Sequence, residues 1–538
     1  MLIGIDGAPF DLVSRWADDG TLPNIASFIQ RGSFGALEAP IPDTPPSWSS
    51  IYTGKNAGKH GVYDFVKPKV GSSRQELVNS TSRDSRDLWE IIGARGLKVG
   101  VLNAPLTYPP RQVNGVLVAG FLTPDGARDY TYPIDLGREL EESVPGFHPS
   151  RISQLNVGTE ARRNSYKHEA LATIRNVGAA AKYLLARGGF DFFAVIFSET
   201  DHLQHVFWDD YNDVASPSVS TRSRFGEPVK DAYRMVDSLV GELVAQVGEG
   251  WYTVIVSDHG ACRLKRYFHP NNLLKQAGMI SFRDSLLTKG RKALLRSGIG
   301  AELYLFLSRL GLVRPAILIR PFMLSLSDVD FKRTRAYSIG GGSGLGRIYL
   351  SPRGGEGADG ASSGDYERQR SSIISKLADV SDPQGSKSPI TRIYRREELF
   401  HGQHLLDAPD ILFLMQDGYE AFPWRSFGLS NFTANSNSFR SGTHTNKGIV
   451  AISGDGVKSG RLGGASVMDI APTILHLMGL PVPSDMDGHV LSEALEKEFV
   501  ERSPVEYTRP LEIEQSTHRL TAEEEAKIED NLRALGYI

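Results

Sequence analysis

Short apolar runs alternate with helical patterns along most of this 538-residue chain. The runs that we predict to be buried strands are Leu2–Ile5, Lys98–Leu102, Asp191–Phe197, Thr253–Val256 and Gly448–Ile452. The predicted helices are Leu22–Arg31, Ser85–Arg95, His168–Arg187, Pro228–Val247 and Ala465–Met478. This alternation predicts an α/β fold with a mostly parallel central sheet and helices on both of its faces.

Acidic residues follow three of the predicted strands. Asp6 comes directly after the first strand, and Asp201 and Asp258 lie shortly after two later ones. Ligands of open α/β sheets bind outside the carboxyl ends of the strands. We therefore expect a functional site at this edge of the sheet.

The composition excludes several kinds of site. The chain has 60 basic and 63 acidic residues, so its formal charge is −3 and no binding site for a nucleic-acid polymer is expected. A single cysteine excludes an internal disulfide and a cysteine-rich zinc site. Any metal ion must be held by histidines and carboxylates.

No targeting or membrane-spanning segment is predicted. The first residues lack the basic start and the cleavage site of a signal peptide, so a cytoplasmic location is expected. The most apolar long stretch, Ala301–Met323, is interrupted by Arg309, Arg314 and Arg320, which argues against a membrane span. A buried helical insertion is favoured, and a helix on a membrane surface is the alternative.

The chain is predicted to contain one discontinuous catalytic core. We assign residues 1–274 and 331–505 to this core, residues 275–330 to a basic helical insertion or lid, and residues 506–538 to a C-terminal tail with a helix at Ala522–Leu535. The glycine-rich run Ile339–Gly346 has neither of the two common nucleotide-loop spacings, which favours a flexible loop.

Three sequence motifs offer metal ligands in addition to Asp6. Asp201 and His205 are four residues apart, so both would face the same way on one helical turn. Asp258 and His259 follow a buried strand, and His444 precedes another. Three aspartates and three histidines at one sheet edge are a suitable ligand set for two zinc or manganese ions.

A further candidate is the hydroxyl of Thr44. Pro45 favours Thr44 as the N-cap of a helix over Pro45–Tyr52 that ends at Gly54. Negative charge is stabilised at a helix N-terminus, so a hydroxyl placed there beside a metal ion could act as a nucleophile. An ordinary helix cap is the alternative interpretation.

Several of these segments occur in the order of a known family. They are Asp6, Thr44 with Thr53-Gly54, the run Gly58-Lys59-His60-Gly61-Val62, the motifs around Asp201, Asp258 and His444, and the later Asp469–Leu475 and Met486-Asp487-Gly488. In this order they resemble the alkaline phosphatase superfamily, most closely its type I phosphodiesterase/nucleotide pyrophosphatase branch.

The resemblance implies a metal-dependent phosphohydrolase. One metal ion would be held by Asp201, His205 and His444, and a second by Asp6, Asp258, His259 and the Thr44 oxygen. Zinc is the expected ion, with manganese as the alternative. A phosphodiester or nucleotide pyrophosphate would be cleaved through a covalent phospho-threonine. The metal ions, rather than lysines or arginines, would neutralise the charge of the substrate phosphate. The near-neutral charge of the chain is compatible with this expectation.

Three residues beyond the predicted helix are candidates for binding the substrate. Lys55 and Asn56 carry groups that could contact a phosphate oxygen or the leaving group, and His60 could reach the phosphate. A structural role is the alternative for all three.

Other activities remain open at this point. Trp48 replaces the arginine of the sulfatase motif, which disfavours a sulfatase. A phosphomonoesterase or phosphomutase of the same superfamily is an alternative. A phospho-headgroup transferase or binding protein that docks on membranes through residues 275–330 is another.

Overall fold

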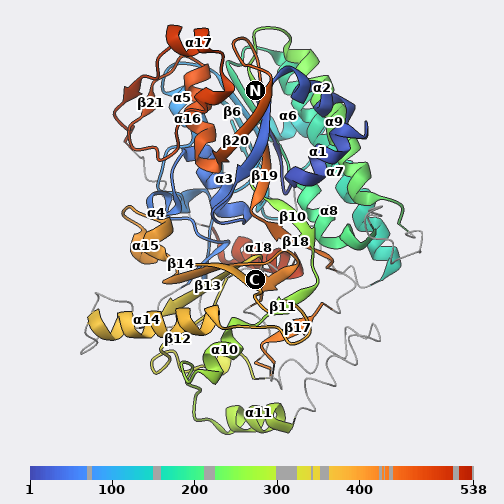
Figure 1. Cartoon of the computed structure of the whole chain (residues 1–538). Coiled ribbons are helices and arrows are strands. Elements are labelled where there is room, and N and C mark those ends of the chain that lie inside the picture. Colours follow the sequence, from blue (N-terminus) through green and yellow to red (C-terminus); the bar gives the residue numbers. More distant parts are fainter. Residues whose placement is uncertain are drawn as a thin grey trace.

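The computed structural model describes residues 1–68, 75–149, 159–210, 225–297, 324–340, 343–351, 363–422, 427–428, 430–435, 440–512 and 520–535. In these ranges the chain forms a large sheet covered by helices and a smaller body with sheets of its own (Figure 1).

The large sheet has nine strands in the order β20-β2-β19-β9-β1-β8-β5-β6-β7. Neighbouring strands from β9 to β6 are parallel, whereas β19 runs antiparallel to β9 and β2, and β7 to β6. The predicted, mostly parallel sheet is therefore confirmed. The bounds are β1 Leu2–Ile5, β2 Ser33–Glu38, β5 Val99–Ala104, β6 Gly115–Ala119, β7 Thr131–Tyr132, β8 Phe192–Phe197, β9 Thr253–Val256, β19 Lys447–Ser453 and β20 Gly460–Ser466.

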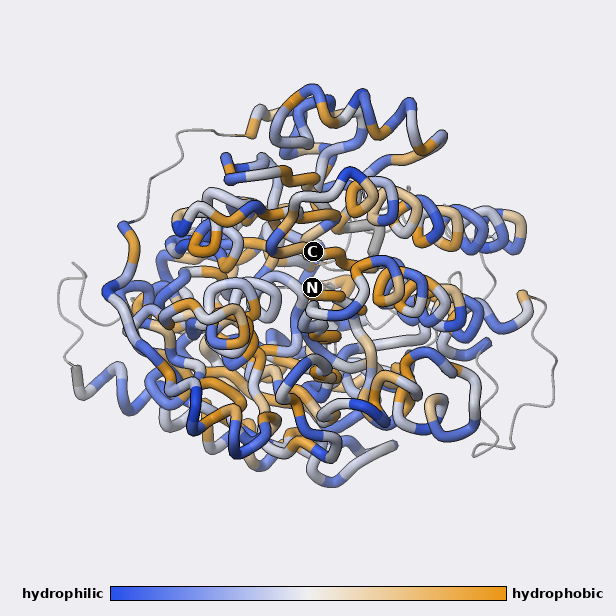
Figure 2. The backbone as a smooth tube through the Cα atoms, turned by 90° about the horizontal axis from the view of Figure 1, so that it is seen from above, coloured by the Kyte–Doolittle hydropathy of each residue, from blue (hydrophilic) through white to orange (hydrophobic). Residues whose placement is uncertain are grey.

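Helices cover both faces of this sheet (Figure 1). One face carries α1 Phe10–Asp18, α2 Pro23–Arg31, α7 Glu160–Arg187, α8 Glu199–Phe207 and α9 Pro228–Val247, and the other carries α3 Thr44–Thr53, α5 Leu88–Gly93 and α16 Ile470–Leu477. Successive strand residues point to opposite faces, so Leu2 lies in one hydrophobic cluster and Ile3 in the other. In Figure 2 the hydrophobic residues gather in the interior, while outer helical turns are mostly hydrophilic.

Most predicted elements occur with shifted ends. The bounds of β1, β9, α9 and α18 Ala522–Leu535 are as predicted. Helix α7 begins earlier, because Thr159 caps it by accepting a hydrogen bond from the Arg162 N–H. The predicted helix Ala465–Met478 begins only at Ile470, since β20 pairs with the edge of the sheet up to Ser466.

The smaller body is built from residues between β9 and β19. It contains a four-stranded sheet, β12-β13-β15-β14, and a three-stranded sheet, β16-β11-β17, around one hydrophobic cluster. The bounds are β11 Arg266–Phe268, α10 Pro270–Gln276, α11 Leu286–Ser297, β12 Ala336–Tyr337, β13 Leu345–Leu350, α14 Ser363–Ala378, β14 Ile390–Arg395, α15 Arg396–Leu399, β15 Ile411–Met415, β16 Tyr419–Ala421 and β17 Phe432–Ala434.

The smaller body includes many more residues than the insertion expected at residues 275–330. Strands β12 to β15 lie within residues 331–505, the range assigned to the core, yet they form a separate sheet. The periodicity of a short buried strand does not tell which sheet it joins, so the sequence could not separate the two. Of the expected insertion, α11 is described, whereas Ala301–Met323 lies outside the described residues. The run Ile339–Gly346 was predicted to be a flexible loop, but its last two residues, Leu345 and Gly346, begin β13.

The C-terminal helix α18 packs on the core. Its Ile528 and Leu532 share a buried hydrophobic cluster with Phe65 and Phe121, so the helix is attached to the part of the chain that carries the large sheet. The remaining elements are β3 Val66–Pro68, β4 Gln75–Leu77, α4 Ala57–His60, α6 Leu136–Ser143, β10 Gly260–Arg263, β18 Gly442–Thr445, α17 Lys497–Arg502, β21 Val482–Pro483 and β22 Tyr507–Thr508. Among the described helices, none has the length and apolarity needed to cross a membrane.

Candidate metal centre

Three adjacent strands bring five of the predicted ligands together. Strands β8, β1 and β9 are parallel neighbours, so their carboxyl ends lie at the same edge. Asp6 follows β1, and Asp258 and His259 follow β9. Asp201 and His205 lie on α8, which begins directly after β8. All five side chains are buried.

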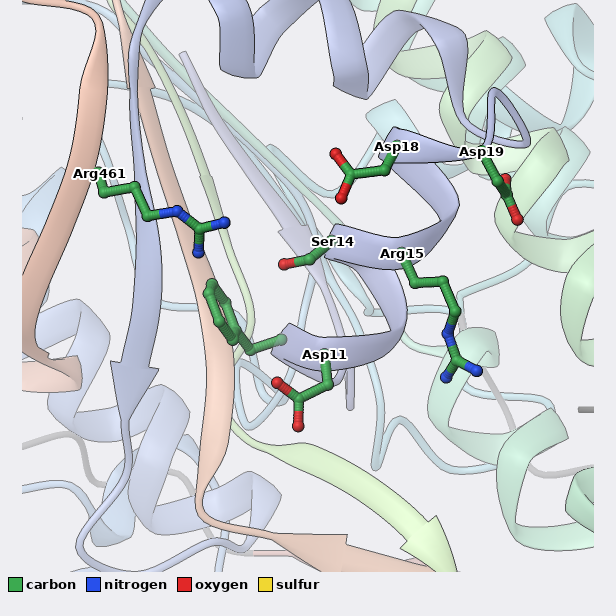
Figure 3. A pocket seen from close by; sticks show the side chains of 7 residues that line it. Asp11, Ser14, Arg15, Asp18, Asp19 and Arg461 are labelled. Atoms are coloured by element: carbon green, nitrogen blue, oxygen red, sulfur yellow. The ribbon is translucent and has the colours of Figure 1, made fainter. Parts of the chain in front are cut away.

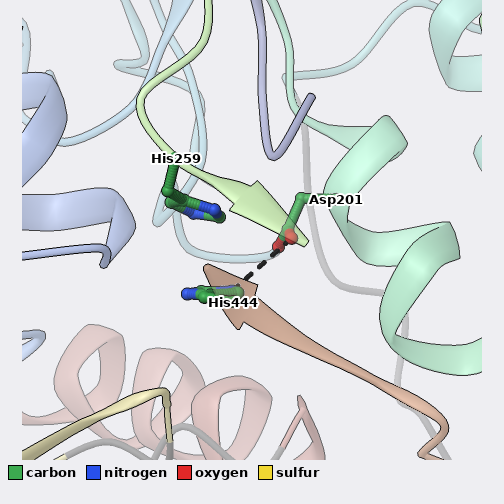
Figure 4. Close-up of side chains that lie close together, drawn as sticks. All are labelled: Asp201, His259 and His444. Carbon is green, nitrogen blue, oxygen red and sulfur yellow. Dashed lines mark ion pairs between the residues drawn. The ribbon is translucent and has the colours of Figure 1, made fainter. Parts of the chain in front are cut away.

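The sixth predicted ligand comes from the far end of the chain. His444 lies on β18, which pairs antiparallel with β10 and places His444 opposite Ala261. Because β10 follows His259 directly, this pairing carries His444 to the ligands of the central strands. Figure 4 shows the side chains of Asp201, His259 and His444 facing one another.

One group of close contacts joins Asp201, His205 and His444. The Nε2 atom of His205 lies 3.2 Å from Asp201 Oδ2 and 2.9 Å from His444 Nε2. The Nε2 atom of His444 lies 3.5 Å from Asp201 Oδ1. These three residues are the set expected for the first metal ion.

A second group joins Asp6, Asp258, His259 and Thr44. The Nε2 atom of His259 lies 3.2 Å from Asp258 Oδ2, 3.7 Å from Asp6 Oδ1 and 3.3 Å from Thr44 Oγ1. The rings of His259 and His444 stack with their centroids 3.8 Å apart, so the two groups adjoin. His259 is also within metal-binding reach of Asp201 and His444.

Backbone carbonyls orient all three histidines in the same way. The Nδ1 atoms of His205, His259 and His444 lie 3.1, 3.0 and 2.8 Å from the carbonyl oxygens of Gly442, Gly260 and Pro42. A carbonyl oxygen can only accept a hydrogen bond, so Nδ1 carries the proton in each ring. In a neutral ring this leaves the lone pair on Nε2, the nitrogen that faces the cluster, as in histidines that bind metals.

In two of the aspartates, one carboxylate oxygen accepts a hydrogen bond and, within the described part of the chain, the other does not. Asp6 Oδ2 accepts a 3.0 Å hydrogen bond from Trp48 Nε1, and Asp258 Oδ1 accepts one of 3.2 Å from the Gly7 N–H. Their other oxygens, Asp6 Oδ1 and Asp258 Oδ2, are buried and accept no hydrogen bond from the described residues. Buried carboxylate oxygens without a donor are costly unless a cation binds them.

Glycines allow two of these close approaches. A Cβ at Gly4 would lie 2.4 Å from Cη2 of Trp48, so only glycine lets the indole reach across β1 to Asp6. Gly7 has a φ of 67°, and a Cβ there would lie 2.8 Å from Asp201 Oδ1. The turn after β1 therefore requires glycine for both its backbone and its space.

The electrostatics of the cluster favour a bound cation. Burial raises the pKa of Asp6 well above its usual range, and the charge of Asp258 adds to the increase. Burial also raises the pKa of Asp258 to about 8. Burial disfavours a charged His444, yet the carboxylate of Asp201 outweighs it and raises the pKa of that imidazole to about 10. The cluster thus retains protons that a divalent cation would replace.

The donor set itself fits zinc or manganese. Three imidazole nitrogens, three carboxylates and one hydroxyl are the ligand types that these ions bind in two-metal sites. The carboxylates, the histidines and Thr44 all belong to buried residues at one sheet edge.

Thr44 opens the helix that carries it. The structure places Thr44 in the first turn of α3 and Asp43 at the N-cap, so the N-cap predicted for Thr44 is one residue too late. Pro45 and Pro46 have no N–H, and the N–H of Ser47 donates to the Asp43 carbonyl. This helix terminus can therefore offer a phosphate only the N–H of Thr44, and most neutralising charge must come from elsewhere.

Lys55, Asn56 and His60 make no hydrogen bond or ion pair with the ligand cluster within the described residues. They follow the C-terminal end of α3, whose ten residues span about 15 Å. Lys55 Nζ is 2.5 Å from Asp485 Oδ2, and Asn56 Nδ2 donates to Asp487 Oδ2 at 2.7 Å. Both contacts join α3 to the C-terminal part of the core.

His60 is buried beside Ser50 but does not form a nucleophile–base pair with it. His60 Nδ1 accepts a hydrogen bond from the Val62 N–H, so its proton is on Nε2. That nitrogen lies 3.1 Å from Ser50 Oγ and donates to it. Burial further lowers the pKa of His60 to about 3. A donor in this position cannot remove the proton of Ser50.

A separate surface depression lies between α1 and β20 (Figure 3). Its lining residues are Phe10, Asp11, Ser14, Arg15, Asp18, Asp19 and Arg461. None of the candidate ligands belongs to this lining, so the depression is not part of the metal centre.

Sequence reasoning missed several residues that hold the centre together. Thr200 Oγ1 donates to the Asp6 carbonyl at 2.7 Å, and Gln204 Nε2 donates to the Gly7 carbonyl at 2.9 Å. Thr200 directly precedes Asp201 and Gln204 directly precedes His205, so the four-residue spacing of Thr200 and Gln204 was the available signal. Arg347 contacts Asp43 from 304 positions away, and no local pattern indicates it.

One family model matches most of the chain. The family model described as type I phosphodiesterase/nucleotide pyrophosphatase matches residues 1–423, a range that includes every candidate ligand except His444. Two solved structures of phosphonoacetate hydrolase from Sinorhizobium meliloti 1021, with phosphonoacetate and with phosphonoformate, match at 13% and 12% identity and TM-scores of 0.49 and 0.48. Each match covers 87% of this chain and 93% of the other. No curated protein matches the sequence.

Proposed function

The chain belongs to the type I phosphodiesterase/nucleotide pyrophosphatase family of the alkaline phosphatase superfamily, and on this basis we propose that it cleaves a phosphodiester or nucleotide pyrophosphate with Thr44 as its nucleophile. Membership makes it a hydrolase of phosphate esters. The identity of the substrate, the nucleophile and the two-metal site are the parts that we propose.

One observation carries the proposal. The Thr44 hydroxyl is buried at the start of α3, 3.3 Å from His259 Nε2, where the two groups of candidate ligands adjoin. Asp201, His205 and His444 would hold one divalent cation, and Asp6, Asp258, His259 and Thr44 the other. Bound cations would lower the pKa of the hydroxyl and offset charge on the phosphoryl oxygens.

The reaction has two displacements at phosphorus. Thr44 Oγ1 forms a bond to phosphorus while the bond from phosphorus to the leaving oxygen breaks. Water then displaces Oγ1, which frees the threonine and releases the phosphate monoester. Helix α3 fixes the hydroxyl for both steps, because the Trp48 indole locks this helix to the Asp6 carboxylate.

Zinc is the favoured ion, and manganese the alternative. The three imidazoles favour zinc, whereas carboxylates bind both ions. Turnover measured after stepwise addition of each ion to the metal-free protein would show which ion supports the higher activity.

A threonine replacement series tests the nucleophile. With bis(p-nitrophenyl) phosphate and zinc, Thr44→Ala should lower kcat at least about a thousandfold, and Thr44→Ser should retain measurable turnover. Ser49→Ala is the matched control, because Ser49 is a buried hydroxyl on the same helix that makes no hydrogen bond within the described residues. Unchanged kcat in Thr44→Ala would contradict the proposal.

The substrate class is tested by comparing kcat/KM values. The wild-type protein should prefer bis(p-nitrophenyl) phosphate or a dinucleotide pyrophosphate over p-nitrophenyl phosphate. A preference for the monoester would instead indicate a phosphomonoesterase with the same nucleophile.

A further inference from the structure

Arg347 reaches from the smaller body into the catalytic core. It lies on β13, in the four-stranded sheet, and its side chain is 2% exposed. Its Nη2 atom donates to Asp43 Oδ2 and lies 3.4 Å from the Tyr63 carbonyl oxygen. Its Nη1 atom lies 3.6 Å from Asp64 Oδ2. One guanidinium from the smaller body is thus clamped between two buried carboxylates of the core.

Asp43 transmits this contact to the metal centre through its other groups. While Oδ2 accepts from Arg347, Oδ1 lies 3.4 Å from Nδ1 of the ligand His444. The Asp43 carbonyl accepts from the Ser47 N–H at 3.1 Å and so closes the first turn of α3. The next residue along the chain is Thr44. A single aspartate therefore contacts the guanidinium, a metal ligand and the helix that carries the nucleophile.

The same part of the smaller body packs against His444 from a second direction. Gly344 directly precedes β13, and a Cβ there would lie 2.7 Å from the His444 carbonyl oxygen. The Pro42 carbonyl that holds His444 Nδ1 precedes Asp43 in the chain. The position of β13 therefore affects both Asp43, through Arg347, and His444, through Gly344.

Stability alone is a poor explanation for this ion pair. Buried ion pairs contribute little net stability compared with apolar side chains of similar size. Arginine does provide a rigid planar fork that fixes the orientation of a carboxylate. In a metal-binding histidine, a hydrogen-bond partner of the ring nitrogen that does not bind the metal orients the ring. Mutation of such a partner typically lowers metal affinity or activity by about 10- to 100-fold.

We propose that Arg347 is a positioning residue through which the smaller body sets the metal centre: it orients Asp43, and Asp43 orients His444 and the start of the Thr44 helix. This inference rests on the proposed function for its catalytic consequence. Its consequence for metal binding depends only on the ligand set.

Conservative substitutions test this role. Arg347→Lys keeps the charge but loses the planar fork, and Asp43→Asn keeps the shape but loses the charge. Both should weaken zinc binding about tenfold, measured by competition with a chelating dye, and lower kcat about tenfold. KM should stay within about twofold, because neither residue would touch the substrate.

Arg396→Lys is the matched control. Arg396 is also buried in the smaller body, and its Nη1 lies 3.1 Å from Oδ1 of buried Asp410, away from the candidate ligands. This variant should lower the melting temperature about as much as Arg347→Lys does, while zinc affinity and kcat stay at wild-type values.

The outcomes separate the possibilities. If Arg347→Lys and Asp43→Asn lower the melting temperature but leave zinc affinity and kcat unchanged, Arg347 is merely structural and the inference is overturned. If Arg347→Lys does not fold, Asp43→Asn decides, because it leaves the guanidinium paired with Asp64. The zinc titration needs no substrate, so it decides the matter even where Thr44→Ala shows the proposed function to be wrong.

Discussion

The indole Nε1 of Trp48 donates a 3.0 Å hydrogen bond to Asp6 Oδ2. Trp48 lies on α3, one helical turn after Thr44, and Asp6 directly follows β1. The other Asp6 oxygen faces His259 and has no hydrogen-bond donor among the described residues. This one contact therefore joins the helix of the proposed nucleophile to a proposed ligand of the second metal ion.

Removing the indole hydrogen-bond donor should leave the Asp6 carboxylate less well oriented for metal binding. Trp48→Phe keeps an aromatic ring but leaves Asp6 Oδ2 without its partner, so zinc affinity should fall about tenfold in a chelator competition. Trp89→Phe is the control, since Trp89 is equally buried and its Nε1 makes no hydrogen bond within the described part of the chain. Equal zinc affinities for both variants would show that the indole does not orient Asp6.

The glycine at the turn after β1 should be needed for metal binding. Gly7→Ala places a Cβ 2.8 Å from Asp201 Oδ1 at a φ of 67°, whereas Gly20→Ala has a φ of 79° and no atom within 4 Å. Both should lose about 1–2 kcal/mol of unfolding free energy in urea through backbone strain. Only Gly7→Ala should also weaken zinc binding. A Gly7→Ala protein with wild-type zinc affinity would be inconsistent with the ligand role of Asp201.

Metal removal should destabilise the fold. Asp6 and Asp258 are buried carboxylates with an oxygen that accepts no hydrogen bond from the described residues, so a bound cation stabilises the folded state over the unfolded one. At a free zinc concentration a hundredfold above Kd, the gain should be about 2.7 kcal/mol. Calorimetry should show a lower melting temperature after dialysis against EDTA and recovery with zinc. In Asp258→Asn the shift should shrink, and a shift of wild-type size would count against this ligand.

A distant carboxylate should affect stability without affecting the site. Asp237 of α9 accepts from Ile25 N at 2.7 Å and from Asn24 N at 3.2 Å, and thereby caps α2. Asp237→Ala should lower the unfolding free energy by about 1–2 kcal/mol in urea and leave zinc affinity unchanged. Glu242→Ala, which removes an exposed ion pair of the same helix, should cost less than about 0.5 kcal/mol. Equal losses in both variants would contradict the capping role.

The sequence allowed the sheet to be predicted and the candidate ligands to be proposed, because both depend on local signals. A buried run such as Leu2–Ile5 is marked by composition, and the ligand that follows it is marked by its place at the strand end. Asp201 and His205 share a helical face, as four-residue spacing requires.

The remainder depends on contacts between segments that are far apart in the chain. Arg347 reads as an ordinary strand residue until β13 is seen beside Asp43. Lys55 and Asn56 looked available to a substrate, but Asp485 and Asp487 hold them. Likewise, β13 lies in the range assigned to the core, and only its pairing with β15 places it in the smaller body.

The most direct test of Thr44 as the nucleophile is to trap the covalent intermediate. The protein would be mixed with zinc and bis(p-nitrophenyl) phosphate, quenched in acid within the first turnover and mapped by peptide mass spectrometry. A p-nitrophenyl phosphate group esterified to Thr44, and absent from Thr44→Ala, is the predicted result. An adduct on another residue, or turnover by Thr44→Ala at the wild-type rate, would contradict this assignment.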